Sequence, residues 1–171
     1  MHIKIVDEID AQRLVDFYQT SRLHLQTWEP ERSDDFYTES YWQELLRQRR
    51  LEMDAGRAVF FIALDDAGNV IASCNLTNIV RGSFQAAYMG YAVAAAWEGK
   101  GIMKQLCEYV VNYGFSELQL NRIMANYLPH NIRSEKLLAG LGFEREGYAR
   151  RYLQINGDWQ DHVLTACVRG D

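Results

Sequence analysis

Two short segments of this chain combine glycine and polar residues in the way that a ligand-binding loop requires. The first is Gly99-Lys100-Gly101, which follows an apolar run ending at Ala94 and precedes a helix-like segment that begins at Ile102. Amides at the start of a helix point together and carry partial positive charge, and glycine lets a phosphate approach the main chain. Neither GxxxxGK[ST] nor GxGxxG is present, so the motifs that usually indicate ATP hydrolysis and nicotinamide binding are both absent. The turn therefore predicts a phosphate site of another kind, or a tight turn without a ligand.

The second segment, Asn131-Ile132-Arg133-Ser134, begins soon after Pro129 ends a strand-like run. Asn131 can cap a helix, and Ser134 lies one turn inside that helix on the same side. On one interpretation the two residues only satisfy the free amides of a helix start. On the other, a second polar helix start after a second strand lies beside the phosphate-binding turn.

The rest of the pattern predicts the elements that hold these segments. Alternating and β-rich runs predict strands at residues 2–6, 59–64, 70–77, 84–94, 122–128, 143–153 and 159–168. Helical spacing predicts helices at residues 10–28, 34–55, 102–118 and 132–141, the first capped by Asp10. Gly90, inside a strand, indicates a bulge or a close approach of the backbone. This order predicts one α/β domain over residues 1–171, with a mixed sheet and helices on both faces.

Composition excludes several classes of function. The 18 basic and 23 acidic residues give a net charge of -5, which disfavours general nucleic-acid binding. The longest nearly uncharged stretch, residues 85–97, is too short to span a membrane, and acidic residues stand where a signal peptide would be apolar, so we expect a cytoplasmic protein. The spacing of the three cysteines and four histidines predicts no metal site.

Both polar segments resemble the GCN5-related N-acetyltransferase (GNAT) superfamily. Its acetyl-coenzyme A motif reads Arg or Gln, two residues, Gly, one residue, and Gly or Ala; here it falls on residues 96–101, with Ala96 in place of Arg or Gln. Segments 28–32, 97–103, 121–134, 141–149 and 159–162 are similar to the ribosomal-protein alanine N-acetyltransferases, and the resemblance covers almost the whole chain.

The resemblance implies a GNAT fold whose central sheet is splayed at the site of acetyl-coenzyme A. A strand edge in the gap can hydrogen-bond the pantetheine arm as it would bond a peptide. The residues implied to contact the cofactor are Tyr91, Val93, Trp97, Glu98, Gly99, Lys100, Gly101, Ile102, Met103, Asn131 and Ser134.

Two groups are candidates for catalysis of acetyl transfer. The backbone amide of Val93 would polarise the thioester, and the hydroxyl of Ser134 would hydrogen-bond or protonate the departing sulfur. No single general base stands out, because each candidate also has an ordinary structural role. The candidates at plausible strand positions are Tyr88, Tyr91, Glu146 and His162.

The acceptor implied by the resemblance is a primary amine, and we favour the N-terminal α-amine of a protein, such as a ribosomal protein. Such an amine has a pKa of about 7.7–8.0, against about 10.4 for lysine, so it needs a weaker base. A small amine (a polyamine or an antibiotic) and a non-catalytic acyl-coenzyme A sensor are the alternatives. Polyamines and basic protein tails would both favour an acidic groove, so net charge does not separate them. Candidates for the acceptor wall, each with a purely structural alternative, are Trp28, Glu29, Arg32, Tyr152 and Trp159.

Overall fold

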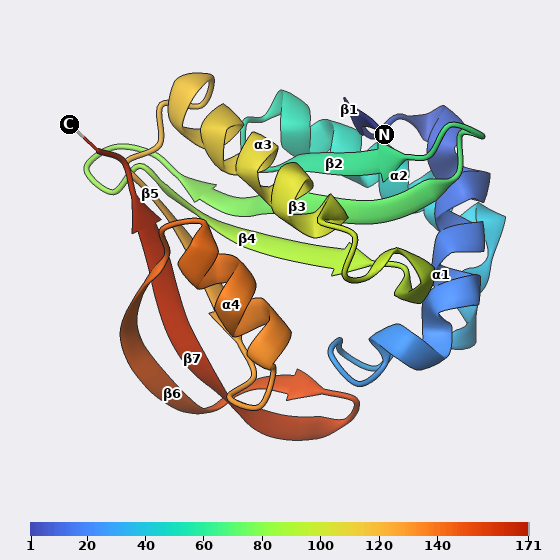
Figure 1. Ribbon diagram of the computed structural model, residues 1–171. Helices are drawn as coiled ribbons and strands as arrows, with labels where there is room; N and C mark the ends of the chain where they lie inside the picture. Colours follow the sequence, from blue (N-terminus) through green and yellow to red (C-terminus); the bar gives the residue numbers. More distant parts are fainter. Residues whose placement is uncertain (171) are drawn as a thin grey trace.

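A computed structural model describes residues 1–170 and contains a seven-stranded mixed sheet with helices on both faces (Figure 1). The strands are β1 (His2–Ile5), β2 (Val59–Leu64), β3 (Val70–Val80), β4 (Ala86–Val93), β5 (Arg122–Tyr127), β6 (Glu144–Ile155) and β7 (Asp158–Val168). The helices are α1 (Ala11–Leu25), α2 (Glu39–Asp54), α3 (Ile102–Ser116) and α4 (Ile132–Gly140). The strand order is β1-β2-β3-β4-β5-β7-β6, and β4-β5 is the parallel pair. The predicted fold class is confirmed.

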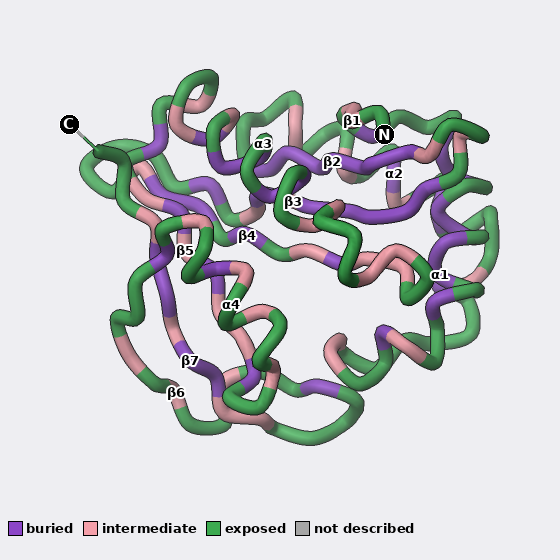
Figure 2. The backbone as a smooth tube through the Cα atoms, in the orientation of Figure 1, coloured by how far each residue is buried: buried purple, intermediate pink, exposed green. Residues whose placement is uncertain are grey.

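Helices cover β2 on both faces, which explains why all of its residues are buried (Figure 2). Phe61 belongs to a core that includes Leu106 of α3, whereas Phe60 belongs to a second core that includes Leu14 of α1 and Trp42 of α2. Successive side chains of a strand point to opposite faces, so an uninterrupted apolar run is what a strand between two helical layers requires. The two cores also include residues of β3 and β4.

The sheet opens between β4 and β5. These strands pair over Ala86 to Tyr88, after which β4 continues on β3 alone. The N–H of Ala94 donates to the carbonyl of Ile71 on β3 at 2.9 Å. Because the main-chain groups of alternate residues face the same side of a strand, the N–H of Val93 points away from β3 and into the gap. The predicted splay is confirmed, with a free strand edge lining it.

Two predicted helices differ from the observed ones. The first helix ends at Leu25, and Trp28 lies in a turn in which its N–H donates to the Leu25 carbonyl at 2.9 Å. The segment 34–55 is not a single helix, because a 3-10 turn at Asp34–Tyr37 is followed by extended backbone at Thr38. The Thr38 side chain then caps α2 by accepting from the Tyr41 N–H. A threonine that caps a new helix starts it at that point and separates it from the preceding turn.

The bulge predicted at Gly90 is wrong. Gly90 pairs in regular register with Asn75, and the irregularity lies in β3, between Thr77 and Val80, where that strand runs three residues past its predicted end. A Cβ added to Gly90 would meet no atom within 4 Å, so the backbone approaches no neighbour there either. The remaining predicted elements agree with the observed bounds to within two residues.

Asp10 does not cap α1 as predicted, because its carboxylate is used elsewhere. The side chain is fully buried and lies 2.7 Å from Lys4 Nζ and 2.9 Å from an Arg13 Nη atom, and it accepts from the Asp7 N–H at 2.9 Å. Burial raises the pKa of Asp10, but these hydrogen bonds together outweigh it and hold the pKa below its ordinary value. The carboxylate ties β1 to the start of α1.

Replacing Asp10 with alanine is expected to lower the free energy of unfolding by roughly 2–3 kcal/mol at pH 7, since hydrogen bonds to charged groups are lost. Because the folded pKa lies below the unfolded one, this contribution is present above the unfolded value and disappears as the pH falls through the folded value. Urea denaturation from neutral to acid pH checks this. The control Asp54→Ala, which removes an exposed pair with Arg50, should change stability by less than about 0.5 kcal/mol. A difference between wild type and Asp10→Ala that does not shrink in acid would contradict the assignment.

Two absences hold for the described part of the chain. None of the helices within residues 1–170 is both long and apolar enough to cross a bilayer. The same residues contain no group of three or more His, Cys, Asp or Glu side chains placed to hold a metal ion.

Candidate active site

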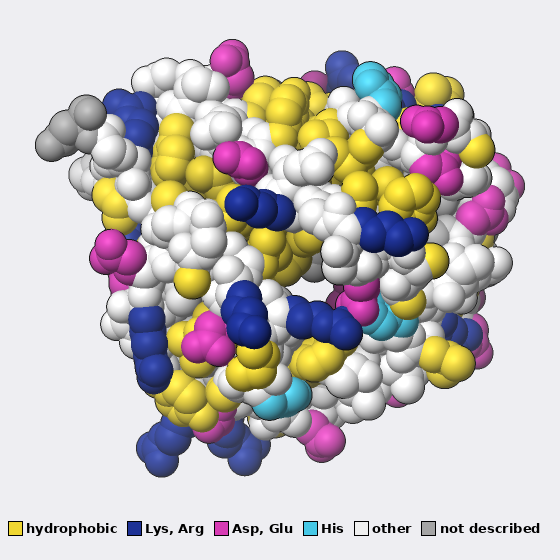
Figure 3. Space-filling model, viewed as in Figure 1, with side chains coloured by type: hydrophobic (Ala, Val, Ile, Leu, Met, Phe, Trp, Pro, Cys, Tyr) yellow, Lys and Arg dark blue, Asp and Glu magenta, His cyan; other side chains and the backbone are white. Residues whose placement is uncertain are grey.

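A cleft of about 390 Å³ opens where β4 and β5 separate, bounded by the turn at 94–101 and the first turns of α3 and α4. Figure 3 shows it as a hollow with lysine and arginine side chains at its rim. Of the eleven residues predicted to contact the cofactor, Lys100 lies outside the lining, with its ammonium 4.7 Å from the centre of the Trp97 ring. The ten that line the cleft are Tyr91, Val93, Trp97, Glu98, Gly99, Gly101, Ile102, Met103, Asn131 and Ser134.

The glycine turn has the conformation that its residues predict. Gly99 and Gly101 have φ angles of 70° and 77°, in the left-handed region that favours glycine. A Cβ on Gly99 would meet nothing within 4 Å, and one on Gly101 only the end of Gln105 at 4.0 Å, so the protein leaves the space over the turn open. No side chain caps α3, which leaves its first amides for a ligand. These features fit the pyrophosphate of coenzyme A.

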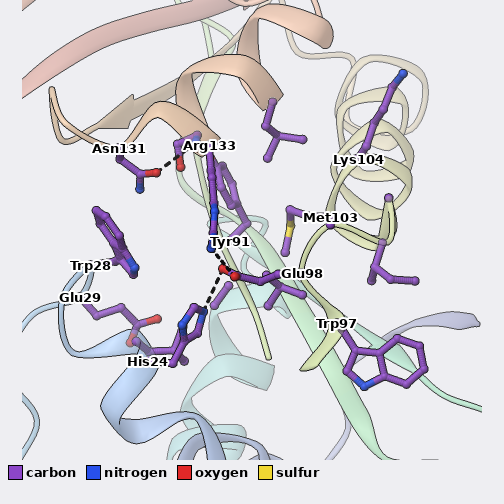
Figure 4. A pocket seen from close by; sticks show the side chains of 18 residues that line it. His24, Trp28, Glu29, Tyr91, Trp97, Glu98, Met103, Lys104, Asn131 and Arg133 are labelled. Atoms are coloured by element: carbon purple, nitrogen blue, oxygen red, sulfur yellow. Dashed lines mark hydrogen bonds and ion pairs between the residues drawn. The ribbon is translucent and has the colours of Figure 1, made fainter. Parts of the chain in front are cut away.

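Glu98 is the centre of an ion-pair cluster that sequence reasoning missed. Its carboxylate lies 3.2 Å from His24 Nε2 of α1 and also pairs with Arg133, which reaches across the cleft from α4 (Figure 4). Glu98 thus connects the turn at 94–101 to α1 and to α4. Lys104 and Arg133 add positive charge to the lining, whereas Ala96 is exposed and lies outside it. Arg133 could have been predicted from the sequence, since it lies inside the polar segment at the start of α4.

The start of α4 is arranged as predicted. The side chain of Asn131 accepts from the Ser134 N–H at 3.1 Å and caps the helix. The cap uses only the main chain of Ser134, so its hydroxyl remains available to a ligand. Burial raises the pKa of Tyr91 well above its ordinary value, and the neighbouring Ser134 hydroxyl lowers it by less. Tyr91 therefore stays protonated at neutral pH and can donate a hydrogen bond beside Ser134.

A second cavity, of about 320 Å³, meets the cleft beside β4. Trp28, Glu29, Tyr91 and Ser134 are among the residues that line both spaces, so the two spaces join at these side chains. Gly90 forms part of the floor, and its missing side chain leaves the cavity open. An acceptor in this cavity would face a thioester in the cleft from the opposite side.

The acceptor candidates are only partly gathered here. Trp28, Glu29 and Arg32 line the second cavity. Tyr152 stands behind its wall and accepts from Asn126 Nδ2 at 3.2 Å. Trp159 is 54% exposed and lies in a separate surface depression with Pro129, His130, Tyr148, Gln160 and Asp161.

The base candidates also separate in space. His162 lines the second cavity, and burial lowers its pKa, which favours the neutral imidazole. Glu146 pairs with Arg122 away from both spaces, and Tyr88 lines neither. Tyr91 faces both. Of the four base candidates, Tyr91 and His162 line the second cavity, and of these two only His162 can accept a proton at neutral pH, because burial keeps Tyr91 protonated.

The charge of the second cavity is not that of an acidic groove. Among the described residues that line it, Glu29 is the only carboxylate, whereas Arg32 and Arg49 supply two guanidinium groups. Burial raises the pKa of Glu29, and Arg32, whose Nη atom lies 3.5 Å away, lowers it by less. Arg49 could not be predicted from the sequence, because it is one of several arginines on a polar helix.

A sheet that parts beside a glycine turn, with a capped polar helix start across the gap, defines an acyl-coenzyme A site. Residues 3–144 match the family model described as acetyltransferase (GNAT) domain, and the chain belongs to this family. It is an enzyme that uses acetyl-coenzyme A as acetyl donor to an amine.

Ribosomal-protein acetyltransferases are among the proteins that this chain resembles. The chain is 44% identical over 170 residues to the ribosomal protein uS5-alanine N-acetyltransferase of Escherichia coli K12, covering 99% of this chain and 88% of the relative. The crystal structure of ribosomal-protein-S5-alanine acetyltransferase from Vibrio fischeri superposes with a TM-score of 0.96 at 36% identity, covering 99% and 93% of the two chains. Mycobacterium smegmatis RimJ in complex with CoA-disulfide gives a TM-score of 0.91 at 30% identity, covering 97% and 80%.

Proposed function

We propose that this enzyme acetylates the N-terminal α-amine of a ribosomal protein that begins with alanine, acting in the cytoplasm as a single domain over residues 1–171. The relatives named for that reaction support the proposal. The observation that carries it is the junction of the two cavities, where one carboxylate, Glu29, lies near Ser134 and Tyr91. A single counter-charge at that point suits one ammonium group.

Acetyl-coenzyme A supplies the acetyl thioester when it is bound. The Val93 N–H, which points into the gap, polarises the thioester carbonyl as a preorganised donor. The acceptor nitrogen forms a bond to the acetyl carbon as the carbon–sulfur bond breaks, the nitrogen loses a proton, and the sulfur gains one. Ser134 donates to the departing sulfur, with the protonated Tyr91 phenol beside it.

Glu29 and Trp28 bind the acceptor in this proposal. The carboxylate of Glu29 attracts the incoming ammonium, and the indole of Trp28 forms a wall of the junction (Figure 4). An α-amine with a pKa of about 7.7–8.0 is partly neutral at pH 7.5, so a water molecule leading to the neutral imidazole of His162 suffices to remove its proton.

Thiol release from acetyl-coenzyme A tests this function on a panel of acceptors: peptides that begin with Ala, Ser or Met, spermidine and an aminoglycoside. We expect turnover with the Ala-starting peptide to exceed turnover with spermidine, because two guanidinium groups line the acceptor cavity. Turnover on spermidine or the aminoglycoside alone would reassign the enzyme to small amines.

A further inference from the structure

Arg49 is held firmly in the wall of the acceptor cavity, although nothing in the reaction so far uses it. It lies on α2, with its guanidinium carbon 4.4 Å from the ring centre of Phe60 and 5.2 Å from that of Trp42. Trp42 and Phe60 are themselves buried in the second core. A guanidinium placed over two rings in this way keeps its plane fixed while the N–H groups at its edge remain free.

No oxygen among residues 1–170 accepts a hydrogen bond from this guanidinium, and no carboxylate lies within ion-pair distance of it. The neighbouring arginines on the same helix differ, since Arg47 pairs with Glu44 and Arg50 pairs with Asp54 on the exposed face. Arg49 is half-buried, and burial lowers the pKa of its guanidinium. A guanidinium in the wall of a cavity, whose N–H groups have no partners in the protein, offers a site for oxygen atoms of a ligand.

We propose that Arg49, together with Arg32, forms a subsite that binds oxygen atoms of the acceptor behind its reacting amine. This inference rests on the proposed function and deepens it, because it names the chemistry of the acceptor next to the amine. The oxygen is a peptide carbonyl or a side-chain carboxylate, both of which accept from a planar guanidinium.

The order of charges along the cavity supports this subsite. Glu29 lines both the cleft and the acceptor cavity, whereas Arg32 and Arg49 line the acceptor cavity but not the cleft. An acceptor thus meets the Glu29 carboxylate, with Arg32 3.5 Å from it, at the junction, and the guanidinium of Arg49 beyond them. A peptide has the matching order, with an α-ammonium followed by carbonyl oxygens. A polyamine has the opposite character, because its second ammonium would lie against the guanidinium groups.

Calorimetric titration of acceptor peptides into the enzyme bound to coenzyme A tests the subsite. Two Ala-starting, C-terminally amidated peptides serve as probes, one with uncharged side chains and one with Glu near the amino end. We expect Arg49→Met to lower the affinity for the uncharged peptide by about tenfold to 100-fold and to leave the affinity for coenzyme A unchanged. If Arg49→Met loses affinity for the Glu-containing peptide alone, the bound oxygen belongs to a side-chain carboxylate. In thiol-release assays, the KM for spermidine should fall in Arg49→Met as repulsion is removed.

Arg50→Met is the matched control, because it lies on the same helix with its side chain on the exposed face. Methionine keeps the unbranched stem of Arg49 against the aromatic rings; Arg49→Lys is the second variant, which keeps the charge but loses the planar fork, and it should bind peptide less tightly than wild type. Equal peptide affinity in wild type and both Arg49 variants would overturn the subsite alone. Wild-type enzyme that binds no peptide would overturn both the subsite and the proposed function.

Discussion

Replacing Ser134 with alanine is expected to lower kcat by roughly 100-fold while the KM for acetyl-coenzyme A stays within about twofold. The hydroxyl lies at the junction of the two cavities, and the Asn131 cap uses only the Ser134 N–H. Alanine therefore keeps the helix start intact and removes the hydroxyl that neighbours Tyr91 and donates to the departing sulfur. Interactions made in the transition state alone appear in kcat and not in ground-state binding.

Steady-state kinetics with an Ala-starting peptide measures this effect. Ser116→Ala, which removes an exposed hydroxyl at the end of α3, is the control and should keep wild-type kcat. An unchanged kcat in Ser134→Ala would refute the role of the hydroxyl. A raised KM for acetyl-coenzyme A with unchanged kcat would assign Ser134 to binding instead.

Replacing Gly101 with valine is expected to raise the dissociation constant of coenzyme A by roughly 100-fold, as the loss of two charge-assisted hydrogen bonds would do. Valine disfavours a φ of 77°, and its branched side chain would occupy the open space over the turn. The amides at the start of α3 would then lose their approach to the pyrophosphate. Calorimetric titration of coenzyme A measures the change.

Gly56→Val separates the loss of binding from backbone strain. Gly56 has a φ of 67° and open space around it, and it lies outside the lining of the cleft. The free energy of unfolding should fall by about 1–2 kcal/mol in both variants, but only Gly101→Val should lose affinity for coenzyme A. Equal affinity for coenzyme A in the two variants would show that the turn does not hold the pyrophosphate.

The part of the site that sequence predicts is local in sequence. Gly99 and Gly101 must adopt their left-handed conformation within one turn, and Asn131 caps a helix whose third residue is Ser134. Such signals need no knowledge of distant contacts. The strand order around β4 follows from the same local pattern, because two strand-to-helix units in succession favour a parallel pair.

The residues that bind the acceptor are harder to predict from the sequence, because they come from elements far apart in the chain. Arg49 of α2 resembles its exposed neighbours Arg47 and Arg50 in sequence, and only packing against Phe60 and Trp42 sets it apart. Trp159 is of a residue type common in binding sites, yet it lies exposed on the β6–β7 hairpin, in a surface depression apart from both cavities. Burial and contacts between distant elements determine where Arg49 and Trp159 lie, and the spacing of residues along the chain predicts neither.

The position of the transferred acetyl group tests the central claim most directly. The enzyme is incubated with acetyl-coenzyme A and a peptide that begins with Ala and contains an internal Lys, and tandem mass spectrometry locates the modification. We predict acetylation of the α-amine of Ala, with the lysine side chain unmodified, since the lysine amine has a pKa of about 10.4 and the junction holds a single carboxylate. Acetyl groups on the lysine side chain, or an unmodified peptide under conditions in which spermidine is acetylated, would contradict it.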